Sequence, residues 1–192
     1  MRSSIQLLLI CIVLLAAAFA QSRENQAVFS FPGDTDRVHS ATGDLLARYT
    51  KIYESQDSAN QYLFSITDTA GNRLAQLNFT RSIEGMWSPY GESLYLNDFI
   101  GSTRIDCFVW SSADKHLMSL TEILMRDPSS GPIEGGGAKP PETPENSRYE
   151  LTCEGWRAQD RVSISLEGDT WAGGQFKYKL IYDLRTKKFS WY

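Results

Sequence analysis

The chain has 192 residues, of which 19 are basic and 23 acidic, and its formal net charge at pH 7 is −4. This length is sufficient for one domain of ordinary size. A mildly acidic chain without a basic cluster is a poor candidate for nucleic-acid binding, because phosphate contacts need concentrated lysine and arginine.

The N-terminus has the pattern of a secretory signal peptide. Arg2 provides a short positive region, residues 5–17 are almost entirely apolar, and Ala18 and Ala20 place small residues where signal peptidase reads them. We predict cleavage between Ala20 and Gln21. The alternative is an uncleaved membrane anchor, for which the apolar run is short. The pattern predicts a secreted or periplasmic protein that is not embedded in a membrane, with residues 21–192 forming a single domain.

Short runs rich in β-branched and aromatic residues follow, with partial alternation of apolar and polar positions. Turn signals such as Gly71-Asn72 and Gly168-Asp169 separate these runs. The pattern predicts an all-β domain. The predicted strands cover residues 46–54, 61–68, 73–80, 93–98, 104–110, 149–155, 161–168, 175–183 and 188–192.

One short helix is predicted near residues 119–126. Ser119 and Glu122 have the spacing of a capping box, in which the serine accepts a first-turn N–H and the glutamate reaches back. Asp127-Pro128 then ends the helix. Residues 128–147 are rich in proline and glycine and nearly free of apolar side chains, so we expect a loop or linker there.

A short motif recurs along the chain. A strand-like run ends at Trp87 and continues into residues 88–91, Ser-Pro-Tyr-Gly, whose residue types favour a type I turn. Glu-Gly, then a tryptophan, recur 69 residues later with Trp156, and residues 40–44 precede a strand in the same register 48 residues earlier. This spacing indicates three degenerate units, at about residues 27–80, 84–125 and 149–192, and therefore about three blade-like antiparallel sheets.

Residues 83–112 resemble one blade of the TolB-type β-propeller repeat, which commonly reads Trp-Ser-Pro-Asp-Gly-Lys before a strand. The chain keeps Trp87, Ser88, Pro89 and Gly91, but has Tyr90 and Glu92 where Asp and Lys are usual. The resemblance implies a structural role for the motif, with the tryptophan filling space between sheets. Closed propellers have about four to eight blades, so three units predict a partial propeller-like stack or a small sandwich.

Of the three cysteines, Cys11 lies in the predicted signal peptide. Cys107 and Cys153 remain, an even number in an oxidising compartment, and each shares its strand face with apolar residues. We predict a disulfide between them. Closing the 46-residue loop stabilises by about 4 kcal/mol in the chain-entropy model. The alternative is two separate buried thiols.

No catalytic or metal-binding constellation is present in the sequence. His39 and His116 lack the neighbours of a zinc site, and no serine-hydrolase elbow occurs. Asn97-Asp98 offers oxygens but lacks the other ligands of a calcium loop, and turn chemistry is the plainer interpretation. The sequence therefore predicts no catalytic residue, no metal and no cofactor.

Trp171 is the most suggestive aromatic residue, because it lies among glycines in a predicted turn. An exposed loop tryptophan is a candidate contact for a partner or a sugar ring, although it can also fold over a sheet edge. Asp169, beside it, and Asp98 are the other candidate binding residues. We expect a non-enzymatic module that binds or scaffolds an unidentified protein. The alternatives are an envelope carbohydrate-binding or hydrolase-inhibitor protein, and an enzyme with an unfamiliar site.

Overall fold

The computed structural model describes residues 27–33, 35–53, 60–101, 105–126, 149–169 and 174–191. The predicted signal peptide, the predicted loop at 128–147 and Trp171 lie outside these ranges. The described residues form three antiparallel sheets and one short helix, which confirms the predicted all-β fold with three sheets.

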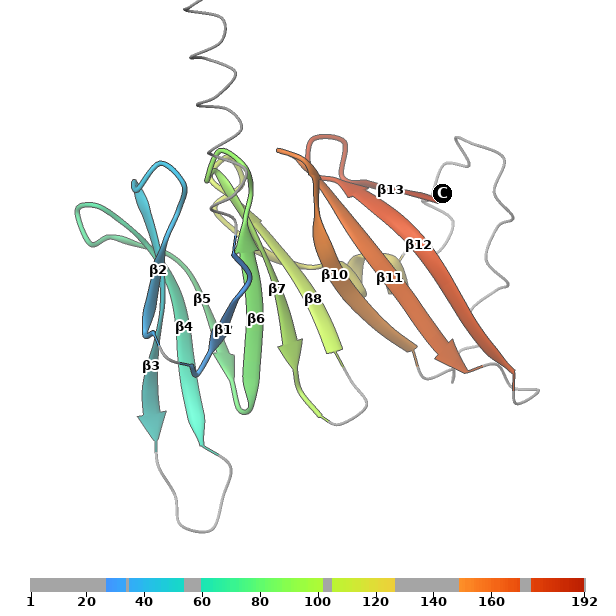
Figure 1. Cartoon of the computed structure of the whole chain (residues 1–192), viewed down its shortest axis with the longest axis horizontal. Helices are drawn as coiled ribbons and strands as arrows, with labels where there is room; N and C mark the ends of the chain where they lie inside the picture. The colour runs from blue at the N-terminus through green and yellow to red at the C-terminus, as the bar shows by residue number, and fades with distance from the viewer. Residues whose placement is uncertain are drawn as a thin grey trace, which may run out of the picture.

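Each sheet is built on a meander of four consecutive strands, and the three sheets stand side by side (Figure 1). The first sheet contains β2 (Arg37–His39), β3 (Leu45–Tyr53), β4 (Gln61–Asp68) and β5 (Arg73–Phe79). The middle sheet contains β6 (Ser82–Trp87), β7 (Ser93–Phe99), β8 (Ile105–Ser111) and β9 (Leu117–Ser119). The third sheet contains β10 (Tyr149–Ala158), β11 (Arg161–Asp169), β12 (Gln175–Asp183) and β13 (Lys188–Trp191).

The first strand departs from the predicted unit boundaries. β1 (Phe29–Phe31) falls within the predicted first unit, but it pairs with β6 and so extends the middle sheet. Its side chains explain this position. Phe31 is fully buried and its ring centroid lies 5.0 Å from that of Tyr49 in the first sheet. The strand therefore links the first two sheets.

The predicted helix is present as α2 (Leu120–Arg126), directly after β9. Ser119 Oγ accepts a hydrogen bond from the backbone N–H of Glu122 at 3.1 Å, as expected of the capping serine. The Glu122 carboxylate pairs with Arg126 one turn later, at 3.3 Å. Leu120 is fully buried, and Ile123 and Leu124 pack against the core between the middle and third sheets.

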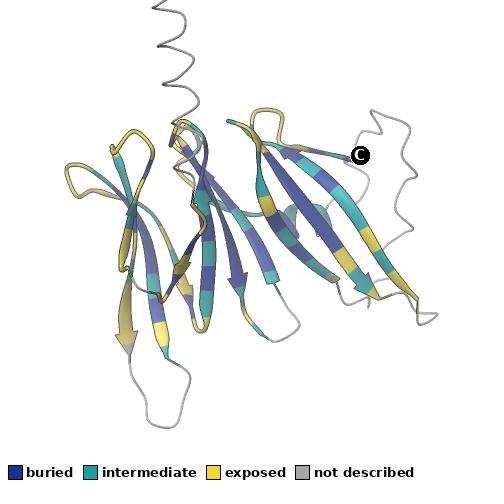
Figure 2. Cartoon of the chain, viewed as in Figure 1, coloured by how far each residue is buried: buried dark blue, intermediate teal, exposed yellow. Residues whose placement is uncertain are grey.

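Two apolar cores lie between the three sheets, one at each interface. The core between the first and middle sheets includes Phe64, Ile66 and Trp110, and the core between the middle and third sheets includes Val109 and Ile164. The middle sheet is covered on both faces, so residues 93–98 of β7 are all buried (Figure 2). Fully burying one large apolar side chain contributes about 1.5–3 kcal/mol, so these cores hold the stack together.

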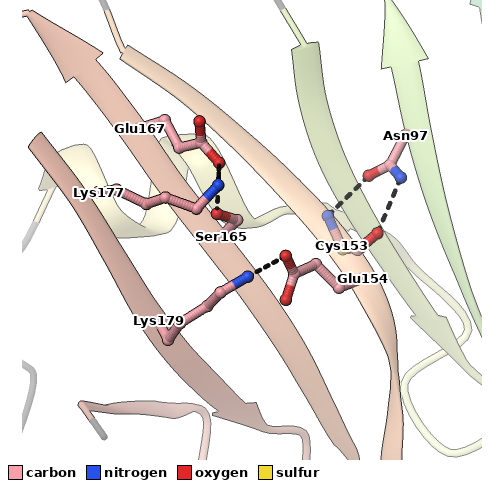
Figure 3. A network of polar contacts seen from close by, with 7 residues as sticks. All are labelled: Asn97, Cys153, Glu154, Ser165, Glu167, Lys177 and Lys179. Atoms are coloured by element: carbon pink, nitrogen blue, oxygen red, sulfur yellow. Dashed lines mark hydrogen bonds and ion pairs between the residues drawn. The ribbon is translucent and has the colours of Figure 1, made fainter. Parts of the chain in front are cut away.

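A disulfide and one amide side chain tie the middle sheet to the third. Cys107 in β8 and Cys153 in β10 form a disulfide with a Cα–Cα distance of 5.8 Å, which confirms the predicted pairing. The Asn97 side chain donates to the backbone carbonyl of Cys153 at 2.9 Å and accepts from its N–H at 2.8 Å (Figure 3). The two sheets are thus joined covalently and by hydrogen bonds at the same point.

Two of the predicted motif turns have the same hydrogen bonds. Gly43 N–H donates to the Ser40 carbonyl at 2.9 Å, and Gly91 N–H donates to the Ser88 carbonyl at 2.8 Å. Both glycines have positive φ, 78° and 74°. The Oγ of Ser40 and of Ser88 also accepts from the backbone N–H five residues later. The register predicted from the sequence is therefore real in these two turns.

Replacing Gly91 by alanine is expected to destabilise the protein more than replacing Gly43. Both changes force a Cβ into left-handed backbone, which costs about 1–2 kcal/mol. A Cβ at Gly91 also lies 2.9 Å from the backbone N of Ala41, whereas one at Gly43 meets nothing within 4 Å. Urea unfolding of both variants measures the difference. Equal losses would show that the neighbouring turn yields without cost.

Candidate functional site

Two turns of each sheet gather at one end of the stack, here called the turn end (Figure 1). Because each sheet is a meander, its first and third turns fall at the same end. The turn end consists of residues 40–44 and 69–72 of the first sheet, 88–92 and 112–116 of the middle sheet, and 159–160 and 184–187 of the third.

Contacts between neighbouring sheets join these turns. Gln159 Nε2 donates to the Glu92 carboxylate at 2.6 Å, across the middle and third sheets. The Lys187 ammonium pairs with the Asp114 carboxylate across the same two sheets. Gly91 lies against the turn that contains Ser40 in the first sheet. The turn end is therefore one connected surface.

Tyr90 is the large aromatic residue exposed on this surface. Its side chain is 47% exposed, at the tip of the 88–92 turn and between the turns of the other two sheets. In the TolB-type repeat that residues 83–112 resemble, this position is usually aspartate. Tyrosine combines a large apolar area with a hydrogen-bonding hydroxyl and few rotatable bonds, and it is enriched among residues that dominate binding energy.

Asp114 at the turn end and Asp183, the last residue of β12, have lowered pKa values. The Lys187 ammonium beside Asp114 holds the pKa of that carboxyl below its ordinary value, with a second hydrogen bond from Ser111 at 2.7 Å. Burial raises the pKa of Asp183, but hydrogen bonds from the Thr186 N–H and the Arg161 guanidinium outweigh it, so the pKa is lowered overall. Both carboxylates are thus stabilised in their charged form.

Acidification is expected to destabilise the protein through these carboxylates. A carboxyl whose folded pKa lies below its unfolded value adds stability above the unfolded value, and this contribution is lost as pH falls through the folded pKa. The free energy of unfolding should therefore fall once the pH drops below about 4, the ordinary value for aspartate. Urea unfolding from pH 6 downward measures it, with about half-unit steps. The Asp114→Asn/Asp183→Asn variant should show a shallower fall, and an identical slope would contradict this assignment.

The outer face of the third sheet, which points away from the middle sheet, is polar. Glu167 accepts hydrogen bonds from the Ser165 hydroxyl at 2.9 Å and from Lys177, and Lys179 pairs with Glu154 (Figure 3). Arg161 and Asp183 pair at 3.0 Å nearer the turn end. Exposed ion pairs contribute only about 0–1 kcal/mol each. This face is consequently suited to water, as expected for the terminal sheet of a stack.

The sequence-predicted binding residues do not form one site. Asp169 is exposed at the end of β11 and borders a hollow of about 380 Å³, which Glu150, Glu167 and Lys177 also line. Asp98 is only 6% exposed and lies inside the stack, on the β7 face that meets the first sheet. Trp171 lies outside the described residues. Asp98 and Asp169 therefore cannot contact one ligand together in this arrangement.

The tryptophans within the described residues belong to the cores. Trp87, Trp110 and Trp191 are buried, and Trp156 packs on Tyr95 with ring centroids 6.0 Å apart. Over the described ranges, no three acidic, histidine or cysteine side chains are grouped so that they could hold a metal ion. No helix in that part of the chain is long and apolar enough to cross a membrane.

Sequence reasoning did not select Tyr90 as a binding residue, although it noted the departure from the repeat at this position. The missing information was exposure. Most described aromatic residues are at least partly buried, and the sequence pattern does not distinguish a buried aromatic residue from an exposed one. Comparison with protein-family models, with curated proteins and with solved structures gives no match to this chain.

Proposed function

We propose that this chain is a non-enzymatic protein-binding or scaffold module whose turn end contacts the partner. The observation that carries the proposal is an exposed tyrosine, Tyr90, at the centre of a surface whose turns are joined across all three sheets. Binding costs less when the surface is already ordered, because fewer side chains and loops lose freedom. A central aromatic residue on such a surface is the common form of a binding hot spot.

The proposal places the protein outside the cytoplasm, secreted or periplasmic, after cleavage between Ala20 and Gln21. The Cys107–Cys153 disulfide supports this compartment, because disulfides persist where the surroundings are oxidising. The intact mass of the secreted protein tests the cleavage position. A mass that includes residues 1–20 would contradict it.

A retention experiment tests the binding role. The tagged chain is mixed with native envelope or secreted extract, and the retained proteins are identified by mass spectrometry. We expect one reproducible partner, and the Tyr90→Ala variant should retain at least about tenfold less of it. Ile52→Ala is the matched control, because Ile52 is similarly exposed, at 53%, but lies in β3 away from the turn end.

The same experiment tests whether the turn end is the binding face. Loss of the partner with Trp171→Ala, but not with Tyr90→Ala, would contradict this. Retention of no protein by a folded, oxidised sample would contradict a protein-binding role.

Binding to carbohydrate, or to a hydrolase, is the second candidate function. The hollow beside Asp169 favours it, since a concave site with carboxylates suits sugar hydroxyls or the cationic groups of an enzyme. Binding to a glycan array that is lost with Asp169→Asn and unchanged with Tyr90→Ala would support this function over the first.

A further inference from the structure

One asparagine of the chain is followed two residues later by a hydroxyl residue. The sequence is Asn78-Phe79-Thr80, and no other asparagine of the chain has a serine or threonine at this spacing. This is the acceptor pattern for N-linked glycans in exported proteins, in which the middle residue is not proline. A pattern of three residues also arises by chance, so the place of Asn78 in the fold decides what it means.

Asn78 faces solvent although it lies in a strand. It is the penultimate residue of β5, where it pairs with Leu63 of β4. Its neighbours Leu77 and Phe79 pack into the core against the middle sheet, so the Asn78 side chain points to the opposite, outer face. Asn78 is exposed, and so is Thr80, in the bend between β5 and β6. A glycan on this side chain would extend into solvent without displacing a packed residue.

The amide of Asn78 is available, unlike the amides of two other asparagines. Asn97 holds Cys153 through two hydrogen bonds, and the Asn72 Nδ2 donates to the Asp68 carboxylate at 2.8 Å. Over the described ranges, no group hydrogen-bonds the side-chain amide of Asn78. Modifying its nitrogen therefore breaks no contact of the folded chain.

The strand that carries Asn78 is an edge of the first sheet. One side of β5 pairs with β4, and no described strand pairs with the other side. Its seven residues include one charge, at Arg73, and Leu74, Ala75 and Leu77 are only partly buried. A register shift interrupts the start of the strand, but residues 75–79 pair regularly. Such an edge is a template for pairing with another chain unless something covers it.

We propose that Asn78 accepts one N-linked glycan, which covers the free edge of the first sheet. The inference rests on the proposed export of the chain, and it specifies a pathway that transfers oligosaccharides from a lipid pyrophosphate carrier. In the transfer, the Asn78 Nδ2 forms a bond to the anomeric carbon of the sugar, and the bond from that carbon to the pyrophosphate oxygen breaks. The nitrogen loses one proton, and the lipid pyrophosphate leaves with the electron pair of the broken bond.

A glycan at this position leaves the turn end uncovered. β5 begins directly after the 69–72 turn and runs away from the turn end, with Asn78 near its far end. At about 3.3 Å per residue, Asn78 lies roughly 17 Å along the strand from Arg73. Loss of the glycan should therefore leave retention of a partner through Tyr90 unchanged, so the glycan and the binding role are tested separately.

The intact mass of the native chain, before and after treatment with peptide-N-glycosidase, tests the acceptor site. We expect the mass of residues 21–192 plus one oligosaccharide, which the enzyme removes. In a eukaryotic secretion host, Asn78→Gln and Thr80→Ala should each abolish the added mass, whereas Thr80→Ser should keep it. Asn72→Gln is the matched control, since Asn72 is exposed just before β5 but lacks the pattern, and it should keep the added mass.

The mass separates failure of this inference from failure of export. A mature native chain without a glycan would overturn the inference and leave export intact. A native chain without a glycan that still contains residues 1–20 would contradict both.

Sedimentation velocity tests whether the glycan covers the edge. At equal concentration, the glycan-free Asn78→Gln chain should shift toward larger species than the glycosylated chain, with an unchanged urea midpoint. Adding Gln76→Lys to Asn78→Gln should reverse the shift, because a lysine on an edge strand opposes pairing. Thr50→Lys is the matched control, since Thr50 is exposed on the same face but lies in β3, which is paired on both sides. Equal distributions with and without the glycan, or equal reversal by both lysines, would overturn the covering role.

Discussion

Replacing both Cys107 and Cys153 by serine is expected to lower the free energy of unfolding by about 4 kcal/mol. The disulfide closes a 46-residue loop that includes β9 and α2, so its removal gives the unfolded chain much more freedom. Both cysteines are buried, at 0% and 2% exposure, and the two serine hydroxyls would also need hydrogen-bond partners in an apolar core. Urea unfolding of the oxidised chain and of the double variant measures the loss.

Reduction provides the control for this prediction. A thiol reductant should shift the unfolding midpoint of the native chain toward that of the double variant, and it should leave the double variant unchanged. Since Cys11 lies in the predicted signal peptide, no other thiol of the secreted chain would respond. Equal midpoints for the oxidised chain and the double variant would show that the bond adds nothing to the stability of the stack.

The repeat and the turns could be predicted because their signals are local. Residues 88–91 combine proline, which fixes φ, with a glycine that tolerates positive φ, and the structure places a closed turn there. The strand at residues 175–183 agrees with β12. Ser119 and Glu122 similarly define the start of α2 within a few residues of sequence. Each of these elements is determined by neighbours along the chain.

Partners distant in sequence could not be predicted in the same way. The Phe29–Phe31 segment is only three residues long, and nothing in its sequence shows that it pairs with residues 83–85. Its position follows from the aromatic pocket formed by the first sheet, where Phe31 lies 6.4 Å from Phe64 between ring centroids. That pocket exists only once the sheets have assembled.

The candidate site was harder to predict, because face and layer decide exposure. Asn97-Asp98 looked like turn residues in the sequence, but β7 continues to Phe99, so Asp98 lies on the same buried strand face as Leu94 and Leu96. Asp169 stands at the end of a strand whose outward face is free of other sheets, so it is exposed. The sequence of a strand does not show how many sheets pack against each of its faces.

Replacing Asn97 by alanine is expected to lower the free energy of unfolding by about 2–5 kcal/mol, because it leaves the Cys153 N–H and carbonyl without their side-chain partner. Both groups lie in a buried part of the chain, since Asn97 is 4% exposed and Cys153 2%. Each buried polar group that loses its hydrogen bond costs about 1–3 kcal/mol. Urea unfolding of the oxidised variant measures the loss, with the disulfide confirmed intact by thiol titration.

Asn78→Ala separates this effect from the loss of any asparagine in a strand. Asn78 lies in β5 and is exposed, so its replacement should change the free energy of unfolding by no more than about 0.5 kcal/mol. A loss for Asn97→Ala as small as that would mean that water replaces the amide at the junction of β7 and β10. A large loss would show that the middle and third sheets depend on this polar contact as well as on the apolar core and the disulfide between them, through a side chain whose role no local pattern reveals.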